Sequence, residues 1–237
     1  MMLEIVTTED GSNTIYNPEV GENYHSIHGA LQESKHVFVN SGLCYFLDKQ
    51  QASSKSLPGE ETFNSIVSIL EVGFGTGLNF LLSADLCTEK KIDLDYTGIE
   101  AYPLSPQMIN QTKYDQYVSP QLWDQFINNY PDLLTSAISL NSYCKLQIAN
   151  SKLEDFQSEK QYDIIYFDAF ASARQPEMWN EAAINHTIKF LKPGGVFVTY
   201  AITGNLKRAL KILGCKVEKA PGALGKREML RATFPQI

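Results

Sequence analysis

The residues of this sequence best suited to chemistry lie in one glycine-rich segment, Glu71-Val72-Gly73-Phe74-Gly75-Thr76-Gly77. The segment follows an apolar run that starts at Ile66 and precedes apolar residues at helical spacing from Leu78. Glycines allow a sharp turn and a close approach of the backbone to a ligand, and a helix N-terminus offers free N–H groups. The segment therefore predicts a nucleotide-binding turn, although a strand-to-helix turn can also be purely structural.

The spacing of these glycines and two carboxylates narrow the kind of nucleotide. The glycines form G-x-G-x-G, whereas a dinucleotide fingerprint needs G-x-G-x-x-G and would end at Leu78. Glu100 ends the next apolar run, where a carboxylate can accept hydrogen bonds from both hydroxyls of a ribose, unless it is simply an exposed acid. Glu71 is expected near the cationic methionyl end of a sulfonium ligand. Together these residues favour S-adenosylmethionine as the cofactor.

Strand and helix patterns alternate from residue 66 onward. A turn of this kind needs a strand before it and a helix after it to hold it in place. The expected strands are 66–72, 94–100, 145–149, 162–168, 196–200, 215–218 and 227–234, with a turn at 192–195. Helical patterns lie between most of them, including 119–130, which Pro131 is expected to end, and 176–191. These units predict an α/β fold with a doubly wound, mostly parallel, seven-stranded sheet of the class I S-adenosylmethionine methyltransferase type. The last two strands lack an intervening helix and are expected to pair antiparallel.

The first sixty residues lack this alternation. A hairpin is expected around Thr8–Ser12, the end of a segment at Gly42–Tyr45, and a polar loop at 50–59. We therefore predict two parts, an N-terminal cap over residues 1–60 and a methyltransferase domain over residues 61–237.

Composition bounds the class of protein. A chain of 237 residues with 43% hydrophobic residues can build one sizeable core, and no apolar run is long enough to span a membrane. No secretory leader pattern begins the chain, so a cytoplasmic protein without a membrane partner is expected. The four cysteines are scattered and the histidines lack metal-ligand spacing, so no metal is expected.

Charge is distributed unevenly along the chain. Between Asn205 and Arg231 eight basic residues stand against two acidic ones, a local charge of +6, which leaves −13 on the remainder of a chain with net charge −7. A basic segment can bind nucleic-acid phosphates or can simply be a solvated surface. Its candidate phosphate ligands are Lys226 and Arg227, in a loop next to Gly225, and then Lys207 and Arg208.

Two further polar residues end predicted strands, where they would face a ligand at the same edge of the sheet. Asn150 ends the third strand, and its amide oxygen can accept a hydrogen bond from an adenine amino group. Asp168 ends the fourth strand beside the glycine turn, unless it only caps a loop or helix.

Several segments together resemble a known family, the tRNA 5-methylaminomethyl-2-thiouridine methyltransferases, which comprise the methyltransferase half of bifunctional MnmC and a stand-alone form called MnmD. The resemblance covers most of the chain and rests on these segments: Glu71-Val72-Gly73-Phe74-Gly75-Thr76-Gly77-Leu78-Asn79-Phe80, Asp168-Ala169-Phe170-Ala171, Gln175-Pro176-Glu177-Met178-Trp179, Gly225-Lys226-Arg227-Glu228-Met229, Thr199-Tyr200 with Gly204, Lys207 and Arg208, and Tyr24-His25-Ser26 with Gly29-Ala30. Two positions depart from the family pattern, since Ser172 stands where proline is usual and Asn150 where an acid is usual.

The resemblance implies methyl transfer from S-adenosylmethionine to the aminomethyl group of 5-aminomethyl-2-thiouridine at the tRNA wobble position, with the anticodon loop as partner. The product would be 5-methylaminomethyl-2-thiouridine. In MnmC a flavin-dependent oxidase domain follows, and since this chain ends at Ile237 no flavin is expected.

Such a reaction is a direct displacement that needs a neutral amine, held in line with the sulfonium. Asp168 is expected to hydrogen-bond and orient the amine, and an ordinary aspartate is a weak base for an ammonium. Phe170 is expected to wall the pocket or stack on the uracil ring, with core packing as an equal alternative. Trp179 favours packing, and Tyr24 and Ser26 are candidates to cover the cofactor.

Three other functions fit the same residues. The first is an S-adenosylmethionine-dependent methyltransferase acting on a small amine or another RNA base. The second is an aminopropyl transferase resembling spermidine synthase, which shares the fold and an acidic site. The third is a nucleotide-binding regulatory protein without catalysis.

Overall fold

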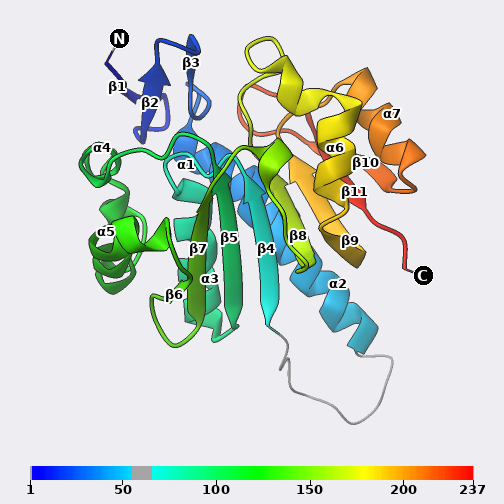
Figure 1. Ribbon diagram of the computed structural model, residues 1–237, viewed down its shortest axis with the longest axis horizontal. Helices are drawn as coiled ribbons and strands as arrows, with labels where there is room; N and C mark the ends of the chain where they lie inside the picture. Colours follow the sequence, from blue (N-terminus) through cyan, green and yellow to red (C-terminus); the bar gives the residue numbers. More distant parts are fainter. Residues whose placement is uncertain (1, 55–65, 237) are drawn as a thin grey trace.

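A sheet of eight strands forms the middle of the molecule (Figure 1). The computed structural model describes residues 2–54 and 66–236, so the predicted domain boundary at residue 60 and the second half of the predicted polar loop lie outside the described residues. In spatial order the strands are β10 (Lys216–Pro221), β11 (Glu228–Thr233), β9 (Leu191–Thr199), β8 (Tyr162–Phe167), β4 (Val67–Val72), β5 (Leu94–Glu100), β7 (Cys144–Asn150) and β6 (Ile138–Ser139).

The five strands from β9 to β7 run parallel, and β10, β11 and β6 are antiparallel to their neighbours. The predicted mostly parallel sheet and the antiparallel final pair are thus confirmed. The eighth strand, β6, was not expected because two residues are too short to show a periodic pattern. All six residues of β4 are buried, as in a parallel strand covered on both faces. From β4 the chain adds β5 and then β7 on one side of the sheet, and later adds β8 and β9 on the other side of β4. The glycine turn follows β4 and therefore lies at the switch point of the strand order.

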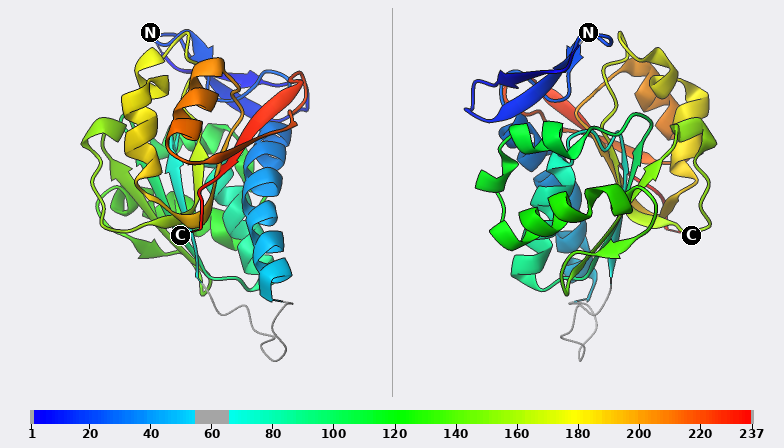
Figure 2. Two further views of the ribbon diagram at one scale, coloured as in Figure 1. Left: turned by 90° about the vertical axis from the view of Figure 1, so that its right-hand side faces the viewer. Right: turned by 60° about the vertical axis from the view of Figure 1, so that its left-hand side comes forward.

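Helices cover both faces of the sheet (Figure 2). On one face lie the continuous helical segments α1 (Ala30–Glu33), η1 (Ser34–Cys44) and α2 (Tyr45–Ser54), with α3 (Leu78–Lys90), α4 (Pro106–Gln111), η2 (Tyr114–Gln116) and α5 (Pro120–Leu133). On the other face lie η3 (Leu153–Asp155), η4 (Pro176–Trp179), α6 (Glu181–Ile188) and α7 (Gly204–Ile212). The helix predicted over 176–191 is therefore divided in two, at Asn180, whose side chain caps α6 by accepting from the Ala183 N–H.

The N-terminal region also contributes a long helix to the core of the protein. Gly42, predicted near the end of a segment, lies in the middle of one long helix that continues to Ser54. A Cβ atom at Gly42 would lie 2.8 Å from the Tyr166 ring and 3.1 Å from Val198. The glycine thus allows the helix to cross the sheet closely and does not end it, which is why the expected segment end is wrong. Val37 and Phe38 of this helix are part of the core.

Two expected breaks are also wrong. Pro131 lies inside α5, between the buried Tyr130 and Leu133, whose packing holds the last turn although proline removes one hydrogen bond. The turn predicted at 192–195 is an irregular stretch within β9, where the pairing with β8 shifts between Tyr162 and Ile164.

A small antiparallel sheet of β1 (Glu4–Thr7), β2 (Asn13–Asn17) and β3 (Glu22–Asn23) lies above the carboxyl ends of the central strands (Figure 1). The predicted hairpin around Thr8–Ser12 joins β1 to β2 and is confirmed. Within the described ranges, none of the helices is long and apolar enough to cross a membrane.

Candidate functional site

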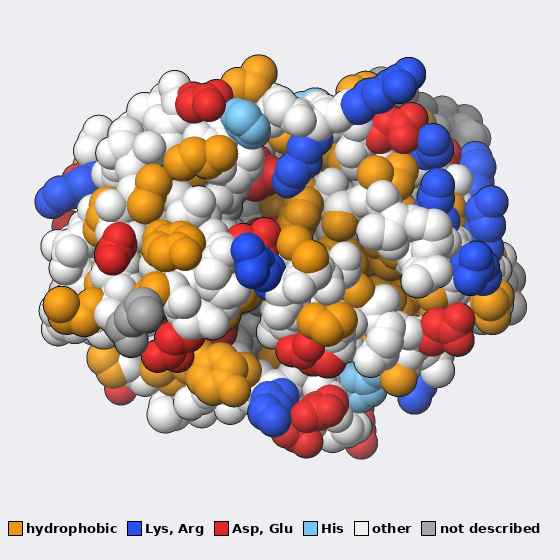
Figure 3. Space-filling model, turned by 90° about the horizontal axis from the view of Figure 1, so that it is seen from above, with side chains coloured by type: hydrophobic (Ala, Val, Ile, Leu, Met, Phe, Trp, Pro, Cys, Tyr) orange, Lys and Arg blue, Asp and Glu red, His pale blue; other side chains and the backbone are white. Residues whose placement is uncertain are grey.

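A cleft of about 1080 Å³ opens at the carboxyl ends of β4, β5 and β8, beneath the small N-terminal sheet. Figure 3 looks onto this end of the molecule and shows a hollow near its middle, edged by acidic, basic and hydrophobic side chains. Of the residues predicted to form the site, Gly73, Gly75, Glu100, Asp168 and Phe170 line this cleft. The structure therefore brings together residues from three separate segments of the chain.

The glycine turn is closely packed against two neighbours. Gly73 and Gly75 have positive φ angles of 85° and 52°, in the region that favours glycine. A Cβ atom at Gly73 would collide with the backbone oxygen of Asp168, and one at Gly75 would lie 2.9 Å from the Tyr24 ring. The turn thus has no room for side chains. Gly77, φ 79°, is the N-cap of α3 and lies outside the cleft lining, against Phe74 and Phe126.

Glu100 is held in a fixed orientation by two backbone amides. Its Oε2 accepts from the Gly75 N–H at 2.8 Å and its Oε1 from the Tyr102 N–H at 3.0 Å. Burial raises the pKa of this carboxyl, and the backbone hydrogen bonds oppose that rise. Each carboxylate oxygen retains a lone pair, so Glu100 can still accept hydrogen bonds from a pair of vicinal hydroxyls in the cleft.

Asp168 follows β8, and its backbone N–H donates to the Val72 oxygen at 2.8 Å, which holds it beside the glycine turn. Its Oδ2 accepts from the Asn79 Nδ2 at 2.8 Å. Burial and then the neighbouring Glu33 raise the pKa of this carboxyl to about 8, while Asn79 and Lys226 lower it. Asp168 is therefore a much better proton acceptor than an ordinary aspartate.

Glu71 lies behind the turn and does not line the cleft. Its side chain is fully buried, with Oε1 accepting from Asn79 Nδ2 at 2.8 Å and Oε2 accepting from the Tyr96 hydroxyl at 2.8 Å. Burial, and the nearby Asp168 and Glu100, raise its pKa well above the usual range. The expected contact of Glu71 with a bound ligand stays a prediction, and the placement favours an action through Asn79.

Asn79, which the sequence reasoning missed as a site residue, joins these two carboxyl groups through one amide nitrogen. The reverse orientation of the amide would place its oxygen against two carboxylate oxygens. In the observed orientation Oδ1 is buried without a partner among the described residues, which costs roughly 1–3 kcal/mol. The two N–H hydrogen bonds to the buried carboxyl groups offset that cost. A polar side chain in the apolar first turn of a helix was the signal that could have identified it.

Aromatic side chains form one wall of the cleft. The rings of Tyr24 and Phe170 meet edge to face with their centres 5.1 Å apart, and both residues line the cleft. Trp179 is buried against Phe167, and its Nε1 donates to the Phe170 oxygen at 2.7 Å, so Trp179 packs and supports Phe170 as expected. Tyr24 lies against Gly75, and its expected cover of the cofactor stays a prediction.

The loop after Asp168 contacts the N-terminal sheet. The Ala171 N–H donates to Glu22 Oε2 at 2.9 Å. Ser172, where the family has proline, is exposed in this loop. Asn150 is exposed at the end of β7 and does not line the cleft, whereas the following residues Ser151 to Leu153 do. The prediction that Asn150 faces a ligand therefore lacks support from its placement, because the strand ends one residue before the chain turns inward.

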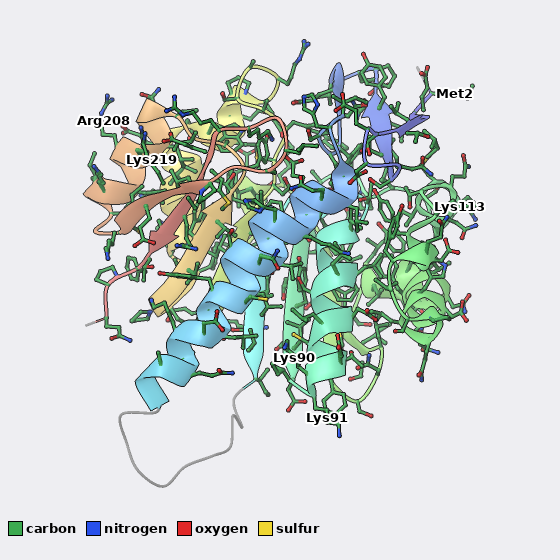
Figure 4. The ribbon with its side chains drawn as sticks, turned by 180° about the vertical axis from the view of Figure 1, so that it is seen from behind. Met2, Lys90, Lys91, Lys113, Arg208 and Lys219 are labelled. Atoms are coloured by element: carbon green, nitrogen blue, oxygen red, sulfur yellow. The ribbon has the colours of Figure 1, made fainter. Side chains whose placement is uncertain are left out.

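Of the four predicted phosphate ligands, Lys226 has a different environment from the other three. Its ammonium pairs with the buried Glu33 and lies 3.9 Å from the centre of the Tyr200 ring. Arg208 and Arg227 are exposed and Lys207 is partly exposed. Lys207 and Arg208 line a shallow hollow with Lys211 and Lys219, and Figure 4 shows Arg208 and Lys219 at the same edge of the molecule. We call Lys207, Arg208, Lys211, Lys219 and Arg227 the basic surface.

In the part of the chain that the structure describes, no group of three or more histidine, cysteine, aspartate or glutamate side chains could hold a metal ion. The arrangement instead suits an organic ligand with vicinal hydroxyls, bound on Glu100 and over the glycine turn, next to an aspartate of raised pKa.

The chain is similar to a methyltransferase family and to named tRNA-modifying proteins. A family model described as S-adenosyl-L-methionine-dependent methyltransferase matches residues 115–235. Proteins named tRNA 5-methylaminomethyl-2-thiouridine biosynthesis bifunctional protein MnmC are similar along the chain. That of Marinobacter nauticus is 30% identical over 91% of this chain and 34% of its own length, and that of Leptospira borgpetersenii is 28% identical over 89% and 32%. The chain thus spans about a third of the length of these relatives.

One solved structure has the same fold throughout. A crystal structure of MnmC2 from Aquifex aeolicus covers all of this chain and 73% of its own, with a TM-score of 0.73 and 22% sequence identity. At this identity the likeness concerns the fold alone, and it agrees with the doubly wound sheet described above.

Proposed function

Because the chain belongs to the S-adenosyl-L-methionine-dependent methyltransferase family, we propose that it methylates the aminomethyl group of 5-aminomethyl-2-thiouridine at the wobble position of tRNA. The product is 5-methylaminomethyl-2-thiouridine, the nucleoside in the names of the MnmC relatives. The observation that carries the proposal is the position of Asp168, which lines the cleft and whose backbone contacts the glycine turn.

The residues of the cleft fit S-adenosylmethionine. The turn at Gly73 and Gly75 leaves the backbone bare where a cofactor would approach, and Glu100 is oriented to accept from ribose hydroxyls. When bound, the cofactor would supply a methyl group on a cationic sulfur, and that sulfur would leave as a neutral thioether when a nucleophile bonds to the methyl carbon. Placing the sulfur near Asp168 is reasonable because the turn and the Asp168 backbone are in direct contact.

Asp168 orients the amine in this proposal. An alkylamine has a pKa of about 10 and is mostly protonated at neutral pH, so only the fraction that has released its proton to solvent can attack. A carboxyl group of raised pKa stabilises the ammonium less than an ordinary carboxylate does and accepts an N–H hydrogen bond from the neutral amine. In-line positioning of the amine then supplies most of the rate.

Recognition of the RNA is divided between two places. Phe170 and Tyr24 provide an aromatic wall on which an extruded base of the anticodon loop can stack. The basic surface provides phosphate contacts for the loop and stem. Lys226 is assigned to its contact with Glu33 and does not belong to that surface. We expect the reaction in the cytoplasm.

Mass spectrometry of wobble nucleosides tests the proposal. Purified protein is incubated with S-adenosylmethionine and tRNA that lacks only the final methyl group. A mass gain of one methyl on the wobble nucleoside is expected, and Asp168→Asn should abolish most of it. Methylation of free small amines or of another RNA base, with the wobble nucleoside unchanged, would establish the alternative methyltransferase, and an aminopropyl mass would establish an aminopropyl transferase.

A further inference from the structure

We propose that Asn79 is the positioning residue of the cleft: it holds one carboxylate oxygen of Asp168, directs the other toward the ligand, and is itself oriented by the buried Glu71. In assigning that ligand the inference rests on the proposed function. The hydrogen bonds that carry it do not, because they are present in the protein alone.

The chain of contacts runs through three elements. The Tyr96 hydroxyl, from β5, donates to Glu71 of β4, and Asn79 of α3 donates one N–H to Glu71 and the other to Asp168. Tyr96 and Glu71 are fully buried and Asn79 is 2% exposed. A buried amide cannot exchange these bonds for bonds to water, so its orientation is set by its two acceptors.

The contact gives the two carboxyl oxygens of Asp168 different partners. Its Oδ2 is taken by Asn79, whereas no side-chain or backbone donor of the described residues reaches Oδ1. Since Asp168 lines the cleft, Oδ1 is the oxygen available to an incoming amine. Without Asn79 the carboxyl group could turn, and the two oxygens would lose their separate roles.

Several charged or titratable groups share this environment. Glu33 of α1 and Lys226, before β11, act on Asp168 in opposite directions, and Tyr200 lies close after β9. Asp168 in turn raises the pKa of Glu71 on β4 and of Tyr96 on β5. Within this set Asn79 donates the uncharged hydrogen bond to Asp168, and that bond lowers the pKa of Asp168. Its removal therefore raises that pKa.

The test compares the affinities of the protein for S-adenosylmethionine and S-adenosylhomocysteine across pH by calorimetry. The first ligand carries a sulfonium charge and the second does not, so their affinity ratio follows the ionisation of Asp168 and needs no methyl acceptor. Asn79→Leu keeps the approximate side-chain shape. In this variant the pH at which the affinity ratio reaches half of its maximum should rise by about one unit or more. Turnover with tRNA should fall about 10- to 100-fold, since the amine loses its fixed acceptor.

Two variants of Glu71 separate orientation from folding. Glu71→Gln can still accept from Asn79 through its oxygen while its amide donates to Tyr96, so it should behave nearly as the wild type. Glu71→Leu removes the acceptor and should reproduce Asn79→Leu. Ser83→Ala is the matched control, because Ser83 lies one turn further along α3, is buried, and bonds only to the Tyr166 hydroxyl among the contacts described, at 3.1 Å. It should leave the pH profile unchanged.

The outcomes are distinguishable from failure of the proposed function. If wild-type protein methylates no tRNA, the proposed function fails, while the affinity ratio still tests Asn79. An unchanged pH profile in Asn79→Leu, or an equal shift in Ser83→Ala, would overturn the inference. So would a profile in the Asp168→Asn variant that still shows the wild-type inflection.

Discussion

The ammonium group of Lys226 is paired with the buried carboxylate of Glu33, two residues that are 193 positions apart in the chain. Glu33 also accepts from the Ser26 N–H at 2.9 Å, and Lys226 lies over the ring of Tyr200. The Tyr200 hydroxyl in turn donates to the oxygen of Ala169, next to Asp168. The pair thus ties the loop before β11 to the first helix beside the cleft.

Lys226→Met should destabilise the protein, because it leaves the Glu33 charge buried without its partner. The side chain of Lys226 is 32% exposed, so the loss is smaller than for a fully buried pair, and we expect about 1–3 kcal/mol because Glu33 keeps the Ser26 N–H. Urea unfolding measures the loss. The double variant Lys226→Met with Glu33→Gln should recover part of it, and Arg227→Ala, which is exposed, should change stability by less than about 0.5 kcal/mol. If Lys226→Met and Arg227→Ala lowered the free energy of unfolding equally, the pairing of Lys226 with the buried Glu33 would be contradicted.

The basic surface should show itself in the salt dependence of tRNA binding. Each phosphate contact removed from Lys207, Arg208 or Arg227 should lower the slope of log affinity against log salt by about one. Filter binding between low and moderate salt measures this slope. Lys90→Ala is the control, since Lys90 is exposed at the far end of α3 (Figure 4). A control slope that falls as much as the others would argue against a localised surface.

Glu100→Ala should weaken S-adenosylmethionine and S-adenosylhomocysteine equally, because both ligands carry the same ribose. Loss of hydrogen bonds to a charged acceptor, about 1.5–3 kcal/mol, corresponds to roughly a 10- to 150-fold rise in each Kd. Calorimetry gives both constants. Asp168→Asn, in contrast, should raise the Kd of the cationic S-adenosylmethionine more than that of the neutral S-adenosylhomocysteine at pH 9. If both variants changed the two Kd values in the same ratio, Glu100 and Asp168 would not contact different parts of the ligand.

The stability of the protein should fall as pH rises toward 8, owing to Asp168. Its pKa is about 8 in the folded protein against an ordinary value of 3.8, so between these values the folded state holds a proton that the unfolded state has released. The contribution of Asp168 to the free energy of unfolding is therefore fully present below about pH 4. It is lost progressively as the pH rises to about 8, with a slope of at most about 1.4 kcal/mol per pH unit. Urea unfolding of wild type and Asp168→Asn across pH 5–9 tests this. The advantage of the variant should grow with pH and level off above 8, and a constant difference would contradict the raised pKa.

Much of the fold and part of the site could be predicted from the sequence. The strand candidates and the glycine turn are local patterns, since burial periodicity and positive φ angles depend on residues within a few positions. Glu100 and Asp168 could be placed because the carboxyl ends of parallel strands meet at one edge of a sheet. The observed pairing of Val72 with both Ile99 and Phe167 brings those two ends together as expected.

The tertiary structure alone decided what each polar group contacts. Asn79 and Asp168 are 89 positions apart, and nothing local indicates that one amide bridges Asp168 and Glu71. Gly42 has the appearance of a helix end in sequence, yet the close approach of Tyr166 makes it a packing residue. Lys226 has the same local pattern as Arg227, but only Lys226 meets a buried carboxylate. Local patterns specify backbone conformation, whereas burial and partner choice depend on long-range packing, and these set the charge and orientation of the groups in the cleft.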